Sequence, residues 1–143
     1  MINLISDEDI LFKEQVETCE FSVSLFDHSS HLRLAYIYLL QSNNTDDSVI
    51  LMREALTGLL KHVRIEPSTK YHETLTEAWV LAVHHFLNKT EHSTSANNFI
   101  EQHPEMLNSN IMLTHYSAEV LFSEEARQSF VEPNLDPIPR YGG

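Results

Sequence analysis

The segment His31-Leu32-Arg33-Leu34-Ala35-Tyr36-Ile37-Tyr38-Leu39-Leu40 carries a single charged side chain, Arg33. Its apolar residues fall on nearly every face of a helix. A helix of that kind is stable only when neighbouring elements cover it on all sides. The segment therefore predicts a central helix with the rest of the chain packed around it.

Helix-start signals and helical spacing of apolar residues predict the elements around this segment. Ser6 is followed by three acids, which is typical of a helix start. The hydroxyl can cap free backbone N–H groups, and acids suit the positive end of the helix dipole. We expect helices over 7–18, over 31–40, from the turn at 43–47 to about 61, and over 71–87, 96–103, 109–116 and 123–130.

The remaining segments are predicted to be irregular. Residues 19–27 alternate apolar and polar side chains, but a lone strand has no partner, so a packed loop is expected there. The polar stretch 88–95 is predicted to be a mobile surface loop. Three prolines forbid helix near the end of the chain, so 131–143 is expected to be an extended tail. The fold class is thus all-α: one domain over 1–143, a bundle of about five to seven helices with a proline-containing tail.

Composition excludes several classes of partner. The 21 acids against 9 basic residues give a net charge of −12, which repels nucleic acids and anionic membrane surfaces. No apolar run approaches the roughly 20 residues that span a bilayer. The single cysteine, Cys19, and the lack of a signal segment at the N-terminus predict a cytoplasmic protein.

Two predicted helix starts carry histidines, in the stretches 26–32 (FDHSSHL) and 70–74 (KYHET). His28 and His31 are three residues apart and lie on one side of the helix if that helix already includes His28, and His72 falls on the inward-facing side of the next buried helix. Neutral imidazole is a good ligand for zinc, iron, copper and manganese. The pattern predicts a divalent transition metal held by these three histidines.

Other polar residues extend this candidate site. Glu73 is predicted to be a further ligand or the base that acts on metal-bound water, and His115 a fourth ligand or an acid/base. Arg33, in an apolar helix, needs a carboxylate partner, either Glu73 or Glu77, or an anionic ligand. Tyr71 could donate a hydrogen bond to a bound group.

Structural roles compete with each of these predictions. His28 also fits a helix cap, His72 fits a histidine bonded to a backbone carbonyl, and His115 fits a cap at a helix end. The spacing lacks the His-Glu-x-x-His or paired Cys-x-x-Cys pattern that identifies metal sites. The sequence also lacks the Gly-x-Ser-x-Gly and glycine-rich phosphate-loop patterns, which argues against a serine hydrolase and a nucleoside triphosphatase.

Two functions from different classes remain open. The first is a metal-binding helical protein, with a small metalloenzyme as its catalytic form. The second is a non-enzymatic module that binds a small anionic ligand or a partner protein, with Arg33 as the anion contact and the histidines as hydrogen-bond donors. The sequence does not decide between an enzyme and a binding protein.

Several strings of this chain also resemble those of a known family. They are Phe26-x-His28-x-x-His31-Leu32-Arg33-Leu34-Ala35, Lys70-Tyr71-His72-Glu73-Thr74 with Trp79, His115-Tyr116-Ser117, and Ala126-Arg127-x-x-Phe130-Val131-Glu132-Pro133. The chain resembles an uncharacterised family of small, all-helical bacterial proteins over about 12–139. The resemblance implies a single helical domain and carries no activity, cofactor or partner.

Overall fold

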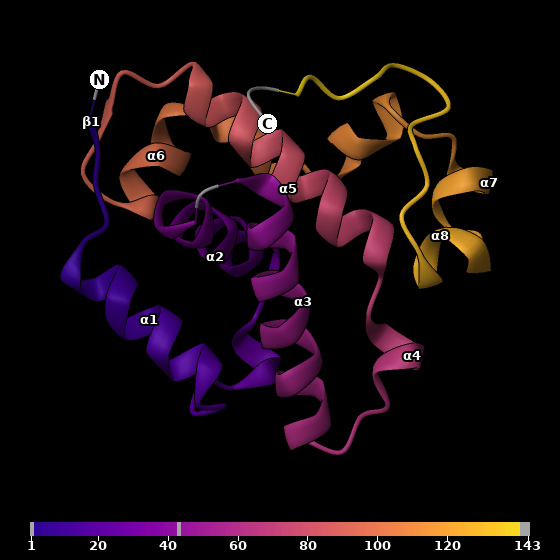
Figure 1. The fold of residues 1–143 in the computed structure, drawn as a ribbon, viewed down its shortest axis with the longest axis horizontal. Coiled ribbons are helices and arrows are strands. Elements are labelled where there is room, and N and C mark those ends of the chain that lie inside the picture. Colours follow the sequence, from indigo (N-terminus) through magenta and orange to yellow (C-terminus); the bar gives the residue numbers. More distant parts are fainter. Residues whose placement is uncertain (1, 43, 141–143) are drawn as a thin grey trace.

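Helix α2 (His28–Gln41) runs through the middle of the molecule in this computed structural model, which describes residues 2–42 and 44–140. Its completely buried side chains are Leu32, Leu34, Ala35, Tyr36 and Ile37. It contacts α1 (Asp7–Glu17), α3 (Thr45–His62), α5 (Glu73–Asn88) and α6 (Ala96–Gln102), and Figure 1 shows it nearly end-on among them. The prediction of a central apolar helix is confirmed.

The all-α fold class is also confirmed. The described residues form eight α-helices, five of them of seven residues or more, and three short 3-10 helices. The shorter elements are α4 (Pro67–Lys70), α7 (Ala118–Leu121), α8 (Glu124–Gln128), η1 (Val23–Leu25), η2 (Pro104–Leu107) and η3 (Ser109–Thr114). Among these helices, none in the described part of the chain is long and apolar enough to cross a membrane.

Side-chain caps start α1, α3, α6 and α8 close to the predicted positions, whereas α2 begins at His28, before the predicted residue 31, and α5 at Glu73, after the predicted residue 71. The Ser6 hydroxyl accepts a hydrogen bond from the backbone N–H of Asp9 at 3.1 Å, and the Asp9 carboxylate accepts one from the backbone N–H of Ser6 at 3.1 Å. Caps also start α3, α6 and α8, from Asn44, Ser95 and Ser123. Asn43, part of the predicted turn, lies outside the described residues.

The loop predicted over 88–95 contains a short strand instead. β1 (Ile2–Asn3) pairs in parallel with β2 (His92–Ser93), and the backbone N–H of Leu4 donates to the carbonyl of Ser93 at 2.8 Å. The predicted loop is therefore tied to the N-terminal segment at residues 92–93, and its mobility stays a prediction. Two-residue strands are too short to show the alternation that identifies a strand in a sequence.

Helices of the C-terminal third are shorter than predicted. The helix expected over 109–116 is the 3-10 helix η3, which ends at Thr114, and the helix expected over 123–130 ends at Gln128 because Ser129 is extended. The single turns α4 and α7 were not predicted from the sequence. Four residues are too few to show helical periodicity.

The proline-containing tail packs against the helices. It has no helix over 131–140, as predicted, and Ile138 is buried. The backbone N–H of Leu135 donates to the carbonyl of His115 at 2.9 Å. The tail therefore covers part of the bundle, and its last residues, 141–143, lie outside the described part of the chain.

Arg33 forms its ion pair with Asp9, across α2 and α1. Arg33 Nε donates to Asp9 Oδ1 at 3.1 Å, and Asp9 Oδ2 accepts from the backbone N–H of Ala96 at 2.9 Å. Asp9 is only 1% exposed. The prediction that Glu73 or Glu77 pairs with Arg33 was wrong, because Arg33 lies on the face of α2 that contacts α1.

We expect Asp9→Ala to lower the free energy of unfolding by about 3–5 kcal/mol, because it leaves the Arg33 guanidinium and the Ala96 N–H without their partner. Urea denaturation followed by circular dichroism measures this loss. Glu8→Ala, an exposed acid in the same turn, is the control and is expected to cost less than about 1 kcal/mol. Equal losses in the two variants would contradict a structural role for Asp9.

Candidate functional site

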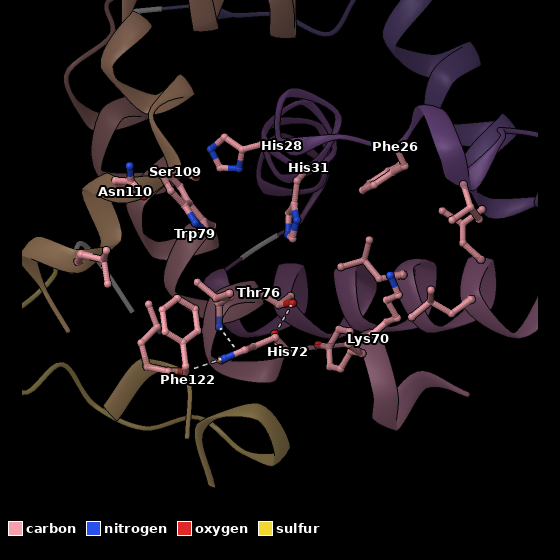
Figure 2. A pocket seen from close by; sticks show the side chains of 18 residues that line it. Phe26, His28, His31, Lys70, His72, Thr76, Trp79, Ser109, Asn110 and Phe122 are labelled. Carbon is pink, nitrogen blue, oxygen red and sulfur yellow. Dashed lines mark hydrogen bonds between the residues drawn. The ribbon is translucent and has the colours of Figure 1, made fainter. Parts of the chain in front are cut away.

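A cavity of about 550 Å³ lies where the starts of α2 and α5 face α3, η3 and the end of α7. Figure 2 shows His28 and His31 on one side of it and His72 and Thr76 on the other. The lining residues are Val23, Phe26, His28, His31, Leu56, Leu59, Leu60, Lys70, Tyr71, His72, Leu75, Thr76, Trp79, Ser109, Asn110, Leu113, Leu121 and Phe122. The two histidine-bearing helix starts therefore converge on one cavity.

His72 is the N-cap of α5, and both of its ring nitrogens are engaged. Nδ1 accepts a hydrogen bond from the backbone N–H of Leu75 at 3.0 Å, and Nε2 donates to the carbonyl of Leu121 at 2.8 Å. Burial lowers the pKa of His72, so the neutral form that this cap requires is favoured. The ring ties the start of α5 to the end of α7.

His28 fills a similar structural position on the other side of the cavity. Its Nε2 donates to the carbonyl of Met106 at 2.9 Å, which ties the start of α2 to η2. The ring meets Trp79 edge-on, with 4.5 Å between the ring centroids. His28 therefore positions the indole that forms one wall of the cavity.

His31 differs from the other two histidines. Its ring is partly buried, and within the described chain Nε2 is buried without a hydrogen-bond partner. Burial, with a smaller contribution from the charge of His28, lowers the pKa of His31 to about 4. At neutral pH the ring is uncharged, so it can offer one donor and one acceptor.

The predicted metal centre receives no support from this geometry. His28, His31 and His72 line the same cavity, as expected, but two of them bond backbone carbonyls through Nε2. No group of three or more His, Cys, Asp or Glu side chains is placed to hold an ion in residues 2–42 and 44–140. Metal binding stays a prediction from the sequence.

Glu73, the predicted base, is held in an ion pair outside the lining of the cavity. Arg53 donates to both of its carboxylate oxygens, at 2.8 and 2.7 Å, and the Tyr71 hydroxyl donates to Oε1 at 2.7 Å. Burial alone would raise the pKa of Glu73, but these hydrogen bonds outweigh it and lower the pKa. The arrangement suits a structural role, with Tyr71 lining the cavity while its hydroxyl is used elsewhere.

Two further predicted site residues lie away from the cavity. Arg33 is paired with Asp9, as described above. His115 Nδ1 donates to the carbonyl of Asp136 at 2.8 Å and so contacts the tail. The structure thus brings together four of the seven predicted residues, namely His28, His31, Tyr71 and His72.

The cavity also contains residues that the sequence did not single out as functional. Lys70, Asn110 and Thr76 contribute polar atoms, and leucines from α3 form an apolar wall. None of the lining residues in the described chain is Asp or Glu, although the whole protein has 21 acids. Lys70 is the only Lys or Arg among them. This separation of charge was not visible in the sequence, because the lining comes from five separate segments of the chain.

Comparisons of the chain with known protein families, with curated proteins and with solved structures found no match. The resemblance to an all-helical bacterial family therefore stays a prediction. The function must be inferred from the geometry of the cavity.

The cap formed by His72 predicts a difference between two substitutions. His72→Ala is expected to lower the free energy of unfolding by about 1–3 kcal/mol, because it removes the cap and the bond to Leu121. His72→Asn keeps a side-chain acceptor for the N–H of Leu75 and should restore part of this loss. Chemical denaturation of both variants measures it, and equal losses would contradict the capping role.

Burial of neutral His31 predicts a loss of stability in mild acid. Its pKa falls from 6.5 to about 4 on folding, so the unfolded chain binds the proton first as the pH drops. This contribution to stability is complete above pH 6.5 and is lost between pH 6.5 and about 4, by on the order of 3 kcal/mol.

His31→Gln should reduce this pH dependence, measured as the free energy of unfolding at a series of pH values. His62→Gln replaces an exposed histidine on α3 and serves as the matched control, which should retain the pH dependence. A His31→Gln curve that runs parallel to the wild-type curve would show that His31 is not buried in its neutral form.

Proposed function

We propose that this protein binds a small, mainly apolar organic molecule in the cavity between α2, α3 and α5. The observation that carries the proposal is an apolar cavity of about 550 Å³ with a few polar side chains converging on it. Binding sites for small molecules are typically concave and apolar, of about 300–1,000 Å³, with few polar groups that orient the ligand.

The apolar walls would supply most of the binding free energy. Apolar side chains from three elements line the cavity: Leu56, Leu59 and Leu60 of α3, Leu113 of η3 and Trp79 of α5. Transfer of an alkyl chain from water into such surroundings contributes about 0.8 kcal/mol per CH₂ group. A ligand with an alkyl chain or an aromatic ring suits this lining.

His31 would supply the polar contact. A buried imidazole nitrogen without a partner costs free energy, so a ligand that brings a hydrogen-bonding group to this ring recovers that cost. The neutral ring can bond a hydroxyl or a carbonyl group. This contact favours a ligand with a hydrogen-bonding group over a pure hydrocarbon.

This proposal corresponds to the non-enzymatic function that the sequence left open, with different contacts. Arg33 does not line the cavity, so the histidine side of the cavity replaces it as the polar contact. The proposal requires no metal ion. It describes a ligand-binding protein of the cytoplasm, the compartment that the sequence predicts, from a bacterium, the source that the family resemblance implies.

A titration with octan-1-ol tests the proposal. Trp79 is the single tryptophan of the chain and lines the cavity, so its fluorescence should change in a saturable way as the alcohol binds. The same alcohol should raise the midpoint of thermal unfolding, because a ligand of the native state stabilises it.

Two matched substitutions locate the binding site. Asn110→Phe places a phenyl ring at an exposed residue that lines the cavity. Because the ring occupies space in the cavity, the affinity for octan-1-ol should fall at least about threefold. Asn97→Phe, at an exposed residue of α6 outside the lining, should leave the affinity unchanged. No saturable change with the wild type, or equal effects of the two variants, would overturn the proposal.

A further inference from the structure

We propose that the ligand of this cavity is an amphipathic anion, an aliphatic or aromatic carboxylate whose charged end lies beside Lys70. The inference rests on the proposed function and specifies its ligand class. Its basis is the charge of the cavity lining and of the segments that adjoin it.

The first argument is the distribution of acids. The chain has 21 Asp and Glu residues against 9 Lys and Arg, yet the described lining contains Lys70 and no acid. Glu73, next to the lining residue His72, is neutralised by the two hydrogen bonds from Arg53. A carboxylate in the cavity would therefore meet a positive side chain without an opposing negative one in the lining.

The second argument is the position of Lys70. It is the last residue of α4 and forms no ion pair with any acid in the described chain. Figure 2 shows it on the opposite side of the cavity from Trp79. An elongated molecule between these two residues would have its apolar end at the indole and its charged end at the ammonium group.

A second cation lies beside the same end of the cavity. Arg127 of α8 donates through Nη1 to the carbonyl of Thr69 at 2.9 Å, one residue before Lys70, and it also forms no ion pair among residues 2–42 and 44–140. Its charge adds to burial in lowering the pKa of His72. Two cations, Lys70 in the lining and Arg127 beside it, therefore lie at this end of the cavity in a protein that is acidic overall.

Uncharged polar groups complete this end of the cavity. His72 caps α5 as a neutral ring, and helix starts carry a partial positive charge. The hydroxyl of Tyr71 points to Glu73 and is not available. The charged and polar groups at this end of the cavity therefore favour binding of an anion over binding of a cation. A neutral molecule is expected to bind with intermediate affinity.

Three probes of equal chain length test the inference at pH 7: octanoate, octan-1-ol and octylammonium. Octanoate should bind at least about threefold more tightly than octan-1-ol, as expected for one partly solvated charge pair, and octylammonium should bind most weakly. Added salt should reduce the difference between octanoate and octan-1-ol. Trp79 fluorescence and isothermal titration calorimetry give the three affinities.

Substitutions of Lys70 identify the charged contact. Lys70→Gln should bring the affinity for octanoate close to that for octan-1-ol, and Lys70→Glu should make octylammonium bind better than octanoate. Lys89→Gln removes the same charge from an exposed lysine at the end of α5 that does not line the cavity, and it should preserve the preference.

The outcomes separate this inference from the proposed function. If octan-1-ol binds and octanoate binds no better, or if Lys70→Gln and Lys89→Gln behave alike, the ligand class is wrong while the cavity remains a binding site. If none of the three probes binds, the proposed function itself fails.

Discussion

The fold depends on the need to cover α2 on every side. A helix with five completely buried side chains from Leu32 to Ile37 has no face that tolerates water, so four other helices must contact it. The ion pair between Arg33 and Asp9 adds direction to this packing. Because Asp9 also binds the backbone of Ala96, one buried carboxylate connects α1, α2 and α6. Hydrophobic contacts thus cover α2, and the polar contacts of Asp9 determine which helices pack together.

The long elements were predictable because their signals are local. The apolar segment 31–40, the cap at Ser6 and the amphipathic stretch before residue 61 each contain enough residues to show a helical pattern or a start signal. The two-residue strands and the single turns α4 and α7 do not. Their formation depends on contacts with segments far away in the chain, such as the bond from Leu4 to the carbonyl of Ser93. Propensity within a few residues carries no information about such partners.

The site was predictable in part for the same reason. The histidines at the two helix starts converge, since both helices are central and their starts adjoin. Which atoms those histidines bind was not predictable, because their partners Met106 and Leu121 are backbone carbonyls in distant short elements. Arg33 illustrates the opposite error: a charged residue in an apolar helix was assigned to acids of the other buried helix, while its partner lies in α1.

The cap of α5 has a consequence for how the cavity responds to protons. Asp, Ser or Asn at an N-cap remains an acceptor at mildly acidic pH, whereas the His72 ring loses its acceptor when it is protonated, because Nδ1 then becomes a donor. After protonation, the Nδ1–H of His72 would face the backbone N–H of Leu75 in the first turn of α5, and two donors cannot form a hydrogen bond with each other. The expected response is local fraying of that turn, and with it a looser contact to α7, before the protein as a whole unfolds. One wall of the cavity is thus coupled to proton uptake through the geometry of a helix start.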